Sequence, residues 1–104
     1  MEISEFQKRM YDLYAHNDRR RGAAATTLWL VEEIGELAEA IRREDMDNIR
    51  EELADCFAWI GALANLCDID LEDAFMRNIP INVLHVERIR AYARIDPFVY
   101  THCI

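Results

Sequence analysis

Two groups of acidic residues in this sequence have the type and the spacing needed to hold a metal ion. The first group is Glu32, Glu33 and Glu36, and the second is Glu52 and Asp55. Residues three or four positions apart lie on one face of an α-helix, so each group directs carboxylates to the same side. Apolar residues flank both groups, and a carboxylate near a core is costly unless a partner neutralises it. A hard divalent cation, which prefers oxygen ligands, is the simplest partner.

These acidic groups lie in a sequence that is predicted to be mostly helical. The 104 residues suit a single domain over 1–104, with 52% hydrophobic residues and only three Gly and two Pro. Apolar residues recur at intervals of three and four, which is the helical period. The fold class is therefore all-α, a bundle of four to five helices. We expect helices over about 3–14, over about 24–43, from Asp45 or Asp47 to about 66, from Asp70 to Pro80, and over about 82–93.

The second and third helices are predicted to form an antiparallel hairpin, because only a few residues connect them. Glu36 lies about seven residues before the end of its helix, and Glu52 lies about five residues after Asp47. At a rise of ~1.5 Å per residue, the two acidic groups differ in height by only ~3 Å. The carboxylates that can then converge on one cavity are those of Glu33, Glu36, Glu52 and Asp55.

The charge of the chain limits its partners. The formal net charge is −8, and ten of the twenty acidic residues fall between Glu32 and Asp55. This concentrated negative patch argues against nucleic acid or an anionic membrane as a partner, although bound metal ions would invert the local potential. No apolar run approaches the roughly 20 residues that span a bilayer. Three cysteines without a C-x-x-C pair favour reduced thiols and a cytoplasmic location.

Two stretches resemble the signature of a known family. Residues 28–41 read LWLVEEIGELAEAI and residues 50–56 read REELADC. They resemble the MazG-like nucleoside triphosphate pyrophosphohydrolases, an all-α superfamily with E-E-x-x-E followed by E-x-x-D, and the resemblance spans about 6–77. It implies cleavage of nucleoside triphosphates between the α- and β-phosphates, which yields a nucleoside monophosphate and pyrophosphate. It also implies Mg²⁺ as cofactor, with Mn²⁺ as a substitute, and a role in nucleotide-pool housecleaning.

The resemblance also implies a role for each acidic residue. Glu33, Glu36, Glu52 and Asp55 occupy the positions of the metal ligands. Glu32 and Glu33 are the catalytic candidates, with Glu32 as an accessory ligand or as the base that acts on the attacking water. The chemistry suits these residue types, because phosphoryl transfer requires mainly positioning and charge neutralisation.

Two tryptophans lie close to the acidic groups in the predicted helices. Trp29 precedes Glu33 by one turn, and Trp59 follows Asp55 by one turn, so both point near the metal side of their helices. They could form an aromatic wall on which a nucleobase stacks. Packing in the core is the alternative for each of them.

Two regions are candidates for holding the phosphates. The family often places a Lys-x-x-x-Asn motif after its fourth helix, and those positions fall on Asn78 and Asn82 here. Asn78 replaces the Lys, and the neighbouring Arg77 could supply the missing charge. Residues 17–22 are predicted to be a connector that holds the only basic run, Arg19–Arg21. This run either reaches the triphosphate, with Arg20 as the site candidate, or belongs to a solvated loop.

The activity and the oligomeric state of the chain remain hypotheses at the level of the sequence. Residues 79–104 form an atypical tail that does not resemble the family. Besides the enzyme, a catalytically weak or inactive helical module that binds metal and nucleotide, or only dimerises, therefore stays open. We expect a homodimer or a dimer of dimers, because one short N-terminal helix cannot cover all of the apolar surface, notably Ile34, Ile41, Leu63 and Leu66.

Overall fold

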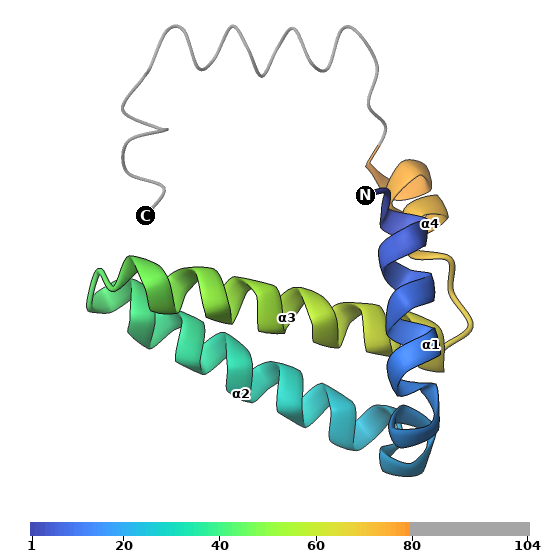
Figure 1. Ribbon diagram of the computed structural model, residues 1–104, viewed down its shortest axis with the longest axis horizontal. Coiled ribbons are helices and arrows are strands. Elements are labelled where there is room, and N and C mark those ends of the chain that lie inside the picture. The colour runs from blue at the N-terminus through green and yellow to red at the C-terminus, as the bar shows by residue number, and fades with distance from the viewer. Residues whose placement is uncertain (80–104) are drawn as a thin grey trace, which may run out of the picture. The chain divides into compact units, whose positions relative to one another are not determined.

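The computed structural model describes residues 1–79, and these contain four helices and no strand (Figure 1). The all-α class is therefore confirmed for this part of the chain. The predicted helix over 82–93, Pro80 and most of the atypical tail lie outside the described residues. The four helices are α1 (Ile3–Arg21), α2 (Ala23–Arg42), α3 (Met46–Leu66) and α4 (Leu71–Asn78).

The first helix is longer than its apolar pattern indicates. The predicted connector over 17–22 was wrong, because α1 continues to Arg21 and only Gly22 interrupts the two helices. Gly22 has φ 86, a conformation that residues with a side chain rarely adopt, and its N–H donates to the Asp18 carbonyl at 2.8 Å. The basic run therefore forms the last turn of α1, where positive charge suits the negative pole of the helix dipole.

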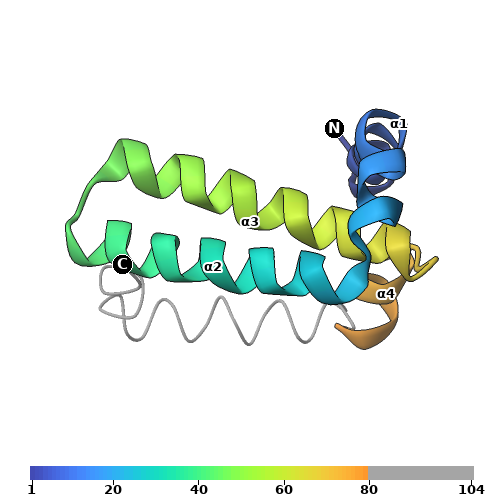
Figure 2. The same cartoon turned by 90° about the horizontal axis from the view of Figure 1, so that it is seen from below.

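The α2–α3 hairpin forms as predicted, and it is the main scaffold of the fold. The two helices lie side by side in both views, and α1 crosses them near the start of α2 and the end of α3 (Figure 1 and Figure 2). Asp45 is the N-cap of α3, and its side chain accepts a hydrogen bond from the Asn48 N–H at 3.2 Å.

The contact between α1 and α3 depends on a glycine. The ring of Phe6 stacks on Phe57 with centroids 4.2 Å apart, and it lies directly over Gly61. A Cβ at Gly61 would come within 2.8 Å of the Phe6 ring, so the absence of a side chain allows this close approach. The buried apolar residues within 1–79 have mostly small side chains: Ala40, Ile49, Cys56, Ala62 and Ala64.

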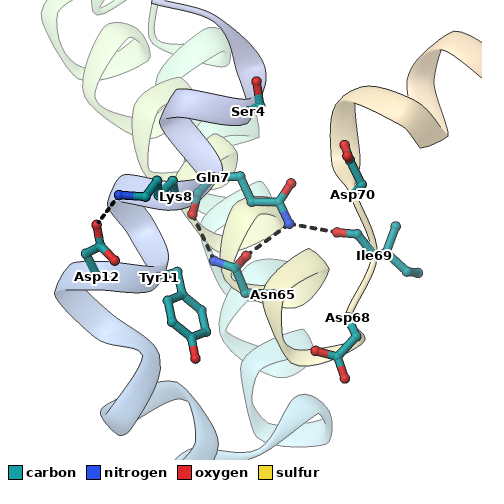
Figure 3. Close-up of a pocket in the computed structure, with 9 residues that line it drawn as sticks. All are labelled: Ser4, Gln7, Lys8, Tyr11, Asp12, Asn65, Asp68, Ile69 and Asp70. Atoms are coloured by element: carbon teal, nitrogen blue, oxygen red, sulfur yellow. Dashed lines mark hydrogen bonds and ion pairs between the residues drawn. The ribbon is translucent and has the colours of Figure 1, made fainter.

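A polar network holds the loop after α3 to α1. The Gln7 amide donates to the Asn65 side chain at 2.9 Å and to the Ile69 carbonyl at 2.7 Å, and it accepts from the Leu71 N–H at 2.9 Å. The Asn65 amide returns a bond to the Gln7 carbonyl at 3.1 Å. The network crosses an open pocket of about 560 Å³ (Figure 3). Because it joins three segments, it sets where the chain leaves α3.

The chain divides into two compact units, Met1–Glu72 and a second that begins at Asp73. The first unit holds α1, α2 and α3 and all of the acidic residues discussed above. Within residues 1–79, no helix combines the length and the apolar character needed to cross a membrane.

Candidate metal centre and adjoining pocket

Three of the four predicted ligands meet at the centre of the α2–α3 hairpin. Carboxylate oxygens of Glu33 and Glu36 on α2 and of Glu52 on α3 all lie within 4.8 Å of one another. Asp55 lies one turn after Glu52; it is half-buried, and its charge contributes to the raised pKa of Glu52. Glu32 is exposed, and its charge helps to raise the pKa of Glu36. The structure therefore gathers Glu33, Glu36 and Glu52 most closely, with the other two acids beside them.

The central carboxyl group is that of Glu52, which is only 8% exposed. Its pKa is raised to about 7, first by a hydrogen bond with Glu33, then by burial, and then by the charges of Glu36, Glu33 and Asp55. The charge of Glu33 is also the main cause of the raised pKa of Glu36. These carboxylates destabilise one another's charged forms, so the cluster favours a positive partner.

The cluster fits a hard divalent cation. Oε2 of Glu33 and Oε2 of Glu52 are buried, and neither has a hydrogen-bond partner within residues 1–79. Buried carboxylate oxygens without partners are costly in a folded protein. The ligand atoms offered here are all carboxylate oxygens, which is the chemistry that Mg²⁺ prefers. A cation held between the two helices would satisfy the buried oxygens and relieve the repulsion.

The raised pKa of Glu52 predicts how the stability of the metal-free protein depends on pH. Between the ordinary value of 4.5 and about 7, folded Glu52 retains a proton that the unfolded chain has released. The free energy of unfolding should therefore fall as pH rises through this window. Thermal unfolding with a chelator should show this fall, and Glu52→Gln should flatten it. If stability depended on pH equally in Glu52→Gln and in the unmodified protein, the raised pKa would not belong to Glu52.

A pocket of about 410 Å³ adjoins the acidic cluster and is lined by residues of α1, α2 and α3. Glu33 and Asp55 line its acidic side, and Arg21 is the one basic residue among its described lining residues. The pocket therefore joins the candidate metal site to the basic end of α1. The full lining consists of Met10, Tyr14, Asn17, Asp18, Arg21, Glu33, Asp55, Ala58, Trp59 and Ala62.

The two tryptophans form a parallel pair beside this pocket. The rings of Trp29 and Trp59 have centroids 6.2 Å apart and an interplanar angle of 11°. Trp29 is 47% exposed, so it is not packed in the core of this chain. A nucleobase inserted between the two tryptophan rings would need them to be about 7 Å apart, which is more than this separation. A nucleobase would therefore stack on the outer face of one tryptophan. The pair lines a second pocket of about 580 Å³ together with Asn17, Arg20 and Arg21.

Arg21 is held in place by three contacts that the sequence did not reveal. Its Nε donates to the Thr26 hydroxyl at 2.9 Å, and its Nη2 donates to the Asp18 carboxylate at 2.5 Å. The guanidinium also lies 4.6 Å from the centre of the Trp59 ring. Arg20, the residue predicted from the basic run, lines only the second of the two pockets beside Trp59. The available signal was the spacing of Asp18 and Arg21, which places them on one face of a helix.

The candidates for phosphate binding near the end of α4 make contacts within their own helix. Arg77 pairs with Asp73 at 2.8 Å, and the Asn78 amide donates to the Ala74 carbonyl at 2.8 Å. Asn82 lies outside the described residues.

Comparison with known families gives one match. The family model of the MazG nucleotide pyrophosphohydrolase domain matches residues 21–80, which is more than half of the chain. This range contains both acidic groups, both tryptophans and Arg21. None of the curated proteins matches the chain.

Proposed function

We propose that the chain hydrolyses nucleoside triphosphates between the α- and β-phosphates, because it belongs to the MazG nucleotide pyrophosphohydrolase domain family. The products are a nucleoside monophosphate and pyrophosphate, and the reaction depends on Mg²⁺, for which Mn²⁺ can substitute. The observation that carries this proposal is the convergence of the Glu33, Glu36 and Glu52 carboxylates within 4.8 Å. The proposed role is housecleaning of the nucleotide pool in the cytoplasm.

The proposed chemistry assigns a task to each acidic residue. Glu33, Glu36, Glu52 and Asp55 would hold the ion. Bound Mg²⁺ supplies neutralisation of the phosphate charge during the reaction. Glu32 would accept the proton of the attacking water as the bond between the α- and β-phosphates breaks, and its exposed position beside Glu33 leaves it accessible. Glu33 serves as a ligand and orients the same water.

The first candidates for contacts with the substrate lie in the unit Met1–Glu72. An outer face of the Trp29–Trp59 pair would stack the nucleobase. Arg20 lines the pocket beside this pair and could contact the phosphates. Arg77, Asn78 and Asn82 are the further candidates for the phosphates, with Arg77 in place of the family Lys.

The direct test is pyrophosphate release from a panel of nucleoside triphosphates, with and without Mg²⁺. We expect release from at least one substrate, and only with the metal present. Metal-dependent nucleotide binding without any release would favour the inactive binding module instead.

We also propose that the chain assembles as a homodimer or a dimer of dimers. Ile34 and Ile41 are 50% and 37% exposed, and Leu63 and Leu66 are half-buried. Leu53 and Phe57 on α3 are also 52% and 46% exposed. Helices of a second chain would remove this apolar surface from water.

Light scattering should therefore give at least twice 12.2 kDa at micromolar concentration. Ile41→Lys should shift the mass toward the monomer, because it introduces a charge into the expected interface. A stable, active monomer of the unmodified chain would refute the shared bundle.

A further inference from the structure

We infer that Arg21 binds a phosphate oxygen of the substrate in the pocket beside the acidic cluster, and that Asp18 is the positioning residue that fixes its guanidinium. The inference deepens the proposed function and rests on it. It assigns the positive charge to the end of α1, at a residue that the acidic motifs do not include.

The first argument is the position of Arg21. It lines the pocket of about 410 Å³ that Glu33 and Asp55 also line. An ion bound by those acids neutralises a phosphate from one side only. Among the described lining residues, Arg21 is the one with a positive charge, and it lies on α1, whereas Glu33 lies on α2 and Asp55 on α3. A guanidinium fork suits phosphate oxygens in particular.

The second argument is that Arg21 retains donors for a ligand. A guanidinium carries five N–H groups. The bonds to Thr26 and Asp18 use one N–H on Nε and one on Nη2. The other N–H groups have no hydrogen bond within residues 1–79, and the Arg21 side chain is 22% exposed. A donor group that is already oriented loses little entropy when an anion binds.

The third argument is the burial of Asp18, which is only 3% exposed. Its Oδ1 accepts from Arg21, whereas its buried Oδ2 has no hydrogen-bond partner within residues 1–79. A buried carboxylate is weak evidence for stability, because its desolvation offsets much of the attraction. The Asp18 carboxylate acts through geometry instead: together with Thr26 and the Trp59 ring, it fixes the plane of the Arg21 guanidinium. Thr26 is itself held by its bond to the Gly22 carbonyl at 2.7 Å.

The test compares five variants: Arg21→Ala, Arg21→Lys, Asp18→Asn, Arg77→Ala and, as the matched control, Arg19→Ala. Arg19 belongs to the same basic run, but it donates to the Tyr11 hydroxyl and does not line this pocket. The probes are inorganic pyrophosphate and a nucleoside monophosphate, each titrated with Mg²⁺ in a calorimeter. Pyrophosphate reports a contact on the leaving group, and the monophosphate reports a contact on the α-phosphate.

Arg21→Ala should weaken the binding of at least one of these anions by roughly 10- to 150-fold, the range for a charge-assisted hydrogen bond. Arg21→Lys keeps a charge but lacks the fork, so it should fold and still bind several-fold more weakly. Asp18→Asn should cause a smaller loss of affinity and raise KM more than it lowers kcat. Arg19→Ala should bind both anions as the unmodified protein does.

Unchanged affinity for both anions in folded Arg21→Ala, or in Arg21→Lys if the alanine variant unfolds, would overturn the inference. A loss of thermal stability without any loss of anion affinity would also overturn it, because Arg21 would then have only a structural role. Weaker anion binding in Arg77→Ala, with normal binding in both Arg21 variants, would show that Arg77 supplies the positive charge instead. An unmodified protein that binds the anions through Arg21 but hydrolyses nothing would refute the proposed function and leave this contact standing.

Discussion

Glu36→Gln and Asp55→Asn are each expected to abolish Mg²⁺-dependent hydrolysis, while the metal-free protein stays at least as stable as the unmodified one. Each change removes one negative charge with little change of shape. The loss of activity should exceed the 10- to 100-fold that is typical when only an outer partner of a metal ligand is changed. Stability should not fall, because the charges of Glu33 and Glu32 already disfavour the ionised form of Glu36.

The matched control for this experiment is Glu39→Gln. Glu39 lies one turn after Glu36 on α2, but its carboxylate pairs with Arg42 at 2.6 Å and with Arg43 at 2.9 Å. Its pKa is lowered, chiefly by the hydrogen bond from Arg42. Glu39→Gln should keep its hydrolytic activity. Full activity in both Glu36→Gln and Asp55→Asn, or an equal loss in the control, would refute the metal assignment.

The second large effect is expected at Gly61, where Gly61→Val should destabilise the fold. A Cβ there would lie 2.8 Å and 2.9 Å from ring atoms of Phe6 and 3.4 Å from Met10. A shift of the Phe6 ring away from this Cβ would disturb its stack on Phe57. Overpacking of this kind costs about 1–3 kcal/mol. In a domain of this size, each kcal/mol lowers Tm by roughly 4–8 °C.

Gly35→Val provides the comparison, because it makes the same change on a helix where a Cβ would meet nothing within 4 Å. Replacing this helical glycine should leave Tm unchanged or raise it slightly. Calorimetry of both variants separates the clash from helix propensity. Equal Tm values for the two variants would show that α1 does not pack on Gly61 in solution.

The acidic cluster could be predicted from the sequence because its geometry is mostly local. Glu33 and Glu36 share a face through helical spacing alone, and a connector of a few residues forces α2 and α3 to be antiparallel. Rise per residue then sets the heights of Glu36 and Glu52. Their proximity in the structure agrees with that reasoning.

The end of α1 could not be predicted in the same way, because it depends on tertiary contacts. The apolar pattern stops near Tyr14, and nothing in 15–21 signals that the helix continues until Gly22 turns the chain. That turn brings Thr26 to Arg21, and the packing of α1 on α3 brings Trp59 to it. The choice between Arg20 and Arg21 depended on the rotational phase of a helix whose extent was not known. The helical period of the sequence therefore located the acidic residues, but it did not identify Arg21 as the basic residue of the same pocket.

The central claim is that the carboxylate cluster supports cleavage between the α- and β-phosphates. Phosphorus NMR of a complete reaction with Mg²⁺ tests this most directly, because it identifies which bond has broken. The account predicts equal amounts of nucleoside monophosphate and pyrophosphate, with no reaction when the metal is chelated. A nucleoside diphosphate with inorganic phosphate, or the same products at the same rate without metal, would contradict it.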